Sequence, residues 1–144
     1  MDIDIRFAVL AFALTLMGGP ASGEPVEVAQ HFTGKWRNPR DTVHLELNAC
    51  GPNICGVVIW ATEASKKEAR RFSDRELVGQ QLFRDFKLGD DGLARGKVFV
   101  PDLGLTFRGT AQHLNADSIK VKGCVIGNLI CKSQVWMRLP EKPH

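Results

Sequence analysis

The chain has 144 residues, of which 44% are hydrophobic and 24% charged. This length fits one domain, and the composition excludes a disordered or a collagen-like chain. The formal net charge of +3 is too small to indicate a nucleic-acid-binding surface by itself.

Residues 1–23 are predicted to be a secretory signal peptide. Residues 7–17 form an apolar run interrupted only by Thr15, shorter than the ~20 residues of a transmembrane helix but typical of the apolar core of a signal. Small residues follow, so cleavage after Ala21 and cleavage after Gly23 both stay open. Only Arg6 supplies the expected basic charge, so an uncleaved anchor or a buried N-terminal helix is the alternative.

Export would place the protein in the periplasm or outside the cell. The mature chain, residues 24–144, would carry a formal charge of +4, because the removed segment holds one arginine and two aspartates. No stable membrane span is expected.

Short β-strand patterns alternate with turn signals in the mature chain. Residues 42–48 alternate cleanly, with Val43, Leu45 and Leu47 on one face. Residues 54–60 are apolar on both faces, which predicts a strand that is covered on both sides. The predicted strands are 33–37, 42–48, 54–60, 80–87, 93–100, 105–113, 117–126 and 132–139.

Residues 61–78 interrupt this rhythm. Thr62 is predicted to cap a helix over residues 63–71, in which Glu63 and Lys67 lie one turn apart. Residues 73–76 then have the spacing of a second capping box.

The resulting prediction is an all-β fold, an eight-stranded antiparallel up-and-down barrel with one short helical insert after the third strand. Such a barrel closes on itself and leaves interior room for side chains or one small ligand. Residues 24–144 would form this single domain.

The four cysteines fall into two pairs, each flanking one short turn. The first pair is centred on residues 52–53 and the second on residues 127–128, a Gly-Asn pair that favours a tight turn. In an exported protein this spacing predicts the local disulfides Cys50–Cys55 and Cys124–Cys131. Cross-hairpin bridges, free thiols and a four-cysteine zinc site stay open as alternatives, although six residues between two zinc ligands is a poor spacing.

Several short motifs occur in order along the chain: Gly34-Lys35-Trp36 and residues 55–60, 77–79, 96–104, 121–124 and 133–138. In combination they resemble the bacterial exported family called domain of unknown function 2147, over nearly all of the mature chain. The resemblance implies a lipocalin-like barrel and no known activity.

The same resemblance implies how the barrel is closed. Gly34 and Trp36 near the start, with Arg138 on the last strand, are similar to the pattern that closes calycin barrels. There the tryptophan packs across the base and the arginine lies over the indole, an arrangement that a planar guanidinium favours.

Catalytic motifs are not found: the sequence contains no Gly-x-Ser-x-Gly, no His-Glu-x-x-His and no phosphate loop. His31, His44, His113 and His144 stand apart in the sequence. We therefore predict no enzyme activity, no cofactor, no metal and no nucleic-acid partner.

The predicted function is the binding of a small apolar or amphipathic molecule inside the barrel. The alternative is an envelope protein-interaction or structural module whose barrel is filled by its own side chains. The candidate lining residues are Val43, Leu45, Val58, Trp60, Phe83, Val98, Phe107 and Val121.

Overall fold

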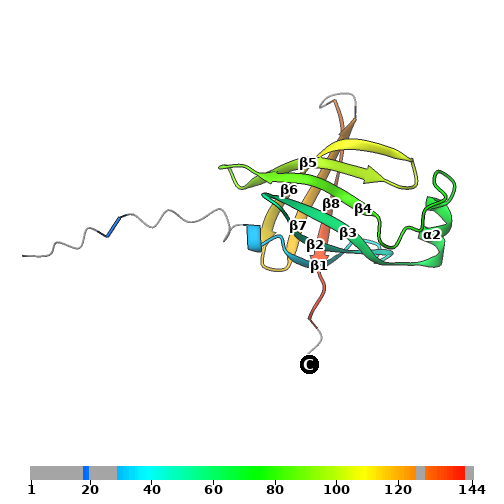
Figure 1. Ribbon diagram of the computed structural model, residues 1–144, viewed down its shortest axis with the longest axis horizontal. Helices are drawn as coiled ribbons and strands as arrows, with labels where there is room; N and C mark the ends of the chain where they lie inside the picture. Colours follow the sequence, from blue (N-terminus) through cyan, green and yellow to red (C-terminus); the bar gives the residue numbers. More distant parts are fainter. Residues whose placement is uncertain (1–17, 20–28, 126–128, 142–144) are drawn as a thin grey trace, which may run out of the picture.

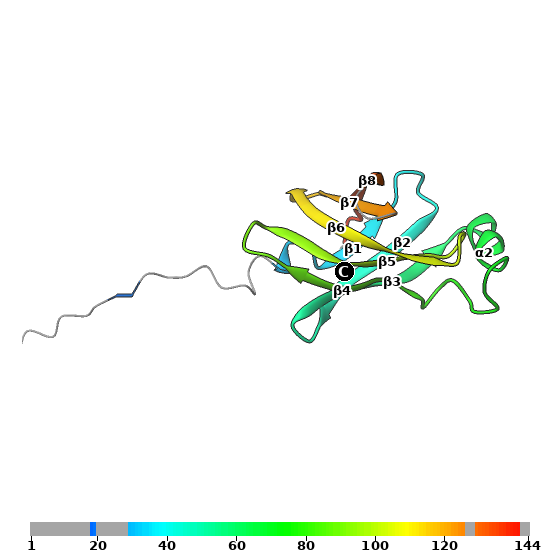
Figure 2. The ribbon, with the colours of Figure 1, turned by 90° about the horizontal axis from the view of Figure 1, so that it is seen from above.

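The computed structural model describes residues 18–19, 29–125 and 129–141. Eight antiparallel strands follow one another in chain order and close into a barrel (Figures 1 and 2). The strands are β1 (Gly34–Arg37), β2 (Val43–Cys50), β3 (Asn53–Ala61), β4 (Gln81–Leu88), β5 (Leu93–Val100), β6 (Leu105–Asn115), β7 (Ser118–Val125) and β8 (Ile130–Arg138). The predicted fold class is confirmed.

The predicted signal peptide and both cleavage positions lie outside the described residues, apart from Gly18 and Gly19. Among the described residues, no helix is long and apolar enough to cross a membrane.

The up-and-down order gives the barrel two distinct ends. We call one end the base; it carries residues 29–33 and the turns at 51–52, 89–92 and 116–117. We call the other end the mouth; it carries the β1–β2 turn, the long β3–β4 connection and the turn at residues 101–104. In Figure 1 the segment at residues 29–33 lies to the left, whereas the helix of the β3–β4 connection lies to the right.

Strand alternation explains most of the burial. On β2, Leu45 and Leu47 are buried, as predicted, whereas His44 and Glu46 point outward and are only half-buried. On β3 the inward residues Ile54 and Val58 are buried. The prediction that β3 is covered on both faces is wrong in part: the outward Cys55, Val57 and Ile59 are only half-buried, because the outer face of a closed single sheet borders solvent.

Helix α2 (Glu63–Ala69) follows β3, as predicted. The Thr62 side chain caps it by accepting a hydrogen bond from the Ser65 amide at 3.2 Å. Glu63 pairs with Lys66, at 2.8 Å, rather than with Lys67. No second helix follows Ser73 in the described chain; its hydroxyl instead accepts a hydrogen bond from the Arg75 amide within the connection to β4.

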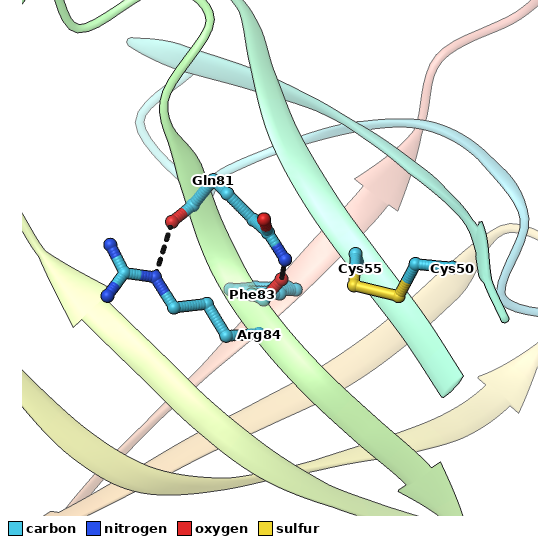
Figure 3. The surroundings of a disulfide bond; sticks show 5 residues. All are labelled: Cys50, Cys55, Gln81, Phe83 and Arg84. Carbon is cyan, nitrogen blue, oxygen red and sulfur yellow. Dashed lines mark hydrogen bonds between the residues drawn. A yellow bond between two sulfur atoms is a disulfide. The ribbon is translucent and has the colours of Figure 1, made fainter. Parts of the chain in front are cut away.

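Both predicted disulfides are confirmed, although the first has a different register from the one expected. Cys124 and Cys131 face each other directly across β7 and β8. Cys50 instead faces Asn53, so the β2–β3 turn is centred on residues 51–52 and Cys50–Cys55 (Figure 3) runs diagonally across the hairpin. Diagonal neighbours still share one face of a sheet, which is why the bond forms.

Aromatic side chains pack the interior of the barrel around Phe83 and Phe86. Phe83 lies 5.5 Å from Phe86 and 5.8 Å from Trp136, measured between ring centroids, and all three are buried. A Cβ added to Gly96 would lie 2.6 Å from the Phe86 ring, and one added to Gly109 would lie 2.5 Å from Val98. At these positions the packing leaves no space for one methyl group.

Candidate functional site

The base of the barrel is closed around Trp36. This side chain is fully buried and donates its indole N–H to the Phe32 carbonyl at 2.9 Å. The guanidinium of Arg138 lies over the indole, 4.2 Å from the ring centroid. A Cβ on Gly34 would collide with this guanidinium, so the Gly34, Trp36 and Arg138 positions meet as one contact group.

Arg138 also holds the base together through three backbone carbonyls. Its Nη1 donates to Thr33 at 2.7 Å, its Nη2 donates to His31 at 2.9 Å, and its Nε donates to Ala116 at 2.8 Å. A single planar side chain therefore ties the N-terminal turn to the β6–β7 turn.

Two histidines that stand apart in the sequence meet beside this arginine. The rings of His31 and His113 lie 4.9 Å apart, and Nε2 of His113 is buried without a hydrogen-bond partner among the described residues. Burial lowers the pKa of His113, and the nearby charges of His31 and Arg138 lower it further. His113 also lines an open hollow of about 400 Å³ at the β4–β5 turn.

The predicted lining residues fall into three groups. Leu45, Val58, Phe83 and Val121 are buried in the core. Val43 and Val98 pack against that core, and Phe107 is half-buried opposite Val98. Trp60 points outward: it is 44% exposed and its ring lies 4.5 Å from that of His44.

Trp60 departs from the expected alternation because β3 carries a bulge. Leu45 pairs with Val58, but the preceding His44 pairs with Trp60, which leaves Ile59 as an extra residue. One extra residue moves the following side chain to the opposite face of the sheet. Trp60 therefore lies on the outer face of the barrel.

The larger hollow lies on the outer side of the barrel, near the mouth. We call this hollow, of about 610 Å³, the outer groove. The connection between α2 and β4 forms one wall, β4 and β5 form the floor, and the turn at residue 104 completes the rim. Its lining residues are Phe72, Ser73, Arg75, Glu76, Val78, Gly79, Gln80, Gln81, Arg84, Phe99 and Gly104.

Arg84 is one of three charged residues that line the outer groove, together with Arg75 and Glu76. Its neighbour Phe83 points into the barrel, so Arg84 points outward from β4. Its Nε donates to the Gln81 carbonyl at 3.1 Å (Figure 3), and its guanidinium carbon lies 4.9 Å from the Phe99 ring centroid. Nη1 and Nη2 have no hydrogen-bond partner in the described part of the chain.

The outer groove was not predicted from the sequence. The predicted ligand lay inside the barrel against the apolar strand faces, whereas Arg84 and Phe99 lie on the opposite faces of the same strands. The available signal was a cationic residue and an aromatic residue on outward positions of two strands expected to pair. Within the described residues 29–125 and 129–141, no group of three His, Cys, Asp or Glu side chains could hold a metal ion.

The closed order of the strands, together with the base around Trp36 and Arg138, is consistent with a lipocalin-like barrel. The chain belongs to the bacterial family described as "Uncharacterized protein conserved in bacteria (DUF2147)", whose model matches residues 34–138. The family resemblance of the sequence motifs is thereby confirmed. No curated protein and no solved structure matches the chain at a significant level.

Proposed function

We propose that the protein binds a small anionic, amphipathic molecule in the outer groove, while the packed barrel acts as a rigid support. The observation that carries this proposal is the guanidinium of Arg84. It is stacked beside Phe99, lines the groove, and has both terminal nitrogens without a partner among the described residues.

A guanidinium with both terminal nitrogens available can bind a carboxylate or a phosphate. Its two terminal nitrogens can donate in parallel to two oxygens of one anionic group. The Nε hydrogen bond to the Gln81 carbonyl and the contact with Phe99 limit its rotation, which lowers the entropic cost of binding. Arg84 is therefore positioned before a ligand arrives.

The apolar part of the ligand has its own contacts in the groove. Phe72 is 55% exposed and Val78 is 41% exposed, and both line the groove together with Phe99. A ligand that combines an anionic group with a short apolar segment would cover these side chains. The barrel interior offers less, because a ligand there would have to displace the rings of Phe83 and Phe86.

The setting of this function is the bacterial cell envelope. The two disulfides are compatible with an exported protein, because such bonds form and persist in oxidising compartments. We propose that residues 1–23 direct export, that the mature domain acts in the periplasm or outside the cell, and that its role is binding without catalysis.

The test uses the fluorescent anion anilinonaphthalene sulfonate with the full mature protein. Arg84→Gln is expected to weaken its binding about tenfold, which corresponds to about 1.4 kcal/mol. The matched control is Arg108→Gln, because Arg108 is an exposed arginine on β6 outside the groove. Dodecyl phosphate should displace the probe, and dodecanol, which lacks the charge, should displace it much less.

An equal effect of both substitutions would contradict the proposal, as would equal displacement by the charged and the uncharged amphiphile. Protein interaction in the envelope is the second candidate function. The filled interior favours it, because a packed barrel needs no internal ligand.

A further inference from the structure

The barrel has an incompletely paired seam between its first and last strands. β8 pairs with β7 along almost its whole length, from residue 130 to residue 137. With β1 it pairs only through Met137 and Arg138, because β1 is four residues long and turns away at Asn38. The mouth half of β8 therefore has no described strand on its β1 side.

The hydrogen bonds at the base show which backbone groups face this gap. The Leu139 amide donates toward β1, to the Lys35 carbonyl, whereas the Arg138 amide donates to Asp117, on the β7 side. Backbone groups of alternate residues in a strand point to the same side. The amides and carbonyls of Ser133 and Val135 therefore face the open side of β8.

This edge is accessible. Ser133 and Gln134 are exposed, and Val135 is 41% exposed. In Figure 1 the β7–β8 hairpin projects at the top of the view, away from α2. The Cys124–Cys131 disulfide joins the two strands next to the edge, so β8 has a fixed partner on its other side. Open strand edges of this kind pair readily with other chains.

The charges around the seam identify the kind of partner. The strands β1, β7 and β8 contain no aspartate or glutamate, whereas their basic residues are Lys35, Arg37, Lys120, Lys122, Lys132 and Arg138. Lys120 and Lys122 pair with Val135 and Ser133 and so lie on the same face beside the edge. Neither lysine forms an ion pair within the described chain.

We propose that the open edge of β8 at residues 132–135 accepts an extended acidic segment of a partner protein as an added strand. The segment occupies the position that β1 would fill if it continued toward the mouth, and its main chain bonds to Ser133 and Val135. Acidic side chains on one of its faces reach Lys120 and Lys122. This inference is independent of the outer groove, which lies on β4 and β5.

A second copy of this chain is the less suitable occupant. Pairing β8 with β8 of a second copy would bring two basic surfaces together. Like charges that face each other across paired strands are destabilising. An acidic segment instead neutralises the unpaired lysines. It also covers the exposed apolar surface of Val135.

The probe for the test is a seven-residue peptide of alternating valine and glutamate, titrated against the full mature protein. Binding should protect the Ser133 and Val135 amides from hydrogen exchange and should weaken as salt is added. The same peptide with lysine in place of glutamate should bind at least tenfold more weakly. The glutamate peptide with N-methyl groups on alternate residues should also lose binding, because it cannot donate main-chain hydrogen bonds.

The matched variants are Ser133→Pro and Ser133→Ala. Proline removes an amide that faces the gap without removing a β7–β8 hydrogen bond, whereas alanine keeps that amide. Ser133→Pro should weaken the binding of the glutamate peptide at least tenfold. Ser133→Ala should leave the affinity for this peptide within twofold of the native value. Thermal unfolding of both variants tests whether the barrel stays intact.

The proposal would be overturned if the glutamate peptide bound a folded Ser133→Pro variant as tightly as it binds the native protein. Equal binding of the lysine peptide would also overturn it, as would protection of amides elsewhere in place of Ser133 and Val135. Self-association that competes with the peptide would show that a second copy is the occupant, and this result also overturns the proposal.

Discussion

Gly109 and Gly123 face each other across β6 and β7, yet only Gly109 is tightly packed. A Cβ on Gly109 would lie 2.5 Å from Val98 and 3.4 Å from the Phe86 ring. A Cβ on Gly123 would meet no atom of the described residues within 4 Å. Within one cross-strand row, the barrel is therefore tightly packed at Gly109 and open at Gly123.

This difference predicts opposite outcomes for the same substitution. Gly109→Ala should lower the free energy of unfolding by about 1–3 kcal/mol, because the methyl group overpacks the core. Gly123→Ala should leave it unchanged or raise it slightly, because alanine has less conformational freedom to lose. Urea unfolding of the two variants measures both values. No cost for Gly109→Ala would refute the tight packing at Gly109, and a cost for Gly123→Ala as large as that for Gly109→Ala would refute the open space at Gly123.

Arg138 is predicted to be the most important charged residue for stability. Arg138→Ala should lower the free energy of unfolding by roughly 3 kcal/mol, since it removes three charge-assisted hydrogen bonds and the contact with Trp36. Arg138→Lys should recover less than half of this loss, because an ammonium lacks the planar fork. Arg108→Ala is the control, and we expect a change below about 0.5 kcal/mol there. A lysine variant as stable as the native protein would argue against this role.

The His113 site predicts that the protein loses stability in mild acid. Burial lowers the pKa of His113 in the folded state, so the unfolded chain takes up the proton at a higher pH. The free energy of unfolding should therefore fall as the pH drops below about 6.5, the usual pKa of histidine, and continue to fall to the lower pKa of the folded state. His113→Phe should reduce this slope.

The carboxylate nearest to His113 in this hollow, Asp91, does not explain such a change. His31 and Arg138 are the charges that act on it, and Asp91 lines the same hollow. The hydrogen bond from Arg95 lowers the pKa of Asp91 to about 2, so this carboxylate stays ionised in mild acid. If the free energy of unfolding of His113→Phe fell with pH as steeply as that of the native protein, another group would be responsible for the loss of stability in acid.

The disulfides are expected to contribute modestly, because each closes a short loop. Replacing Cys50 and Cys55 together by serine should lower the free energy of unfolding by about 2 kcal/mol in the chain-entropy model. The far-UV circular dichroism of the variant should keep its β signal. Loss of that signal would mean that the hairpin disulfide is required for the fold.

The strand order and the disulfide partners could be predicted from local patterns. The alternation of Val43, Leu45 and Leu47 places them on one face, and short turns bring the cysteines of each pair together. Such signals involve residues that are close in sequence. The outward position of Trp60 could not be predicted this way, because the bulge at Ile59 depends on how β2 and β3 pair.

The number and order of the strands, the favoured disulfide pairs and the family could be predicted from the sequence. The surroundings of each side chain became clear only from the folded chain. The fold brought His31 to His113, placed Arg84 beside Phe99, packed Phe83 against Phe86 inside the barrel, and left Ser133 and Val135 at an open edge. The physical reason is that strand patterns depend on neighbours along the chain, whereas packing, bulges and the closure of β1 on β8 depend on contacts between distant residues.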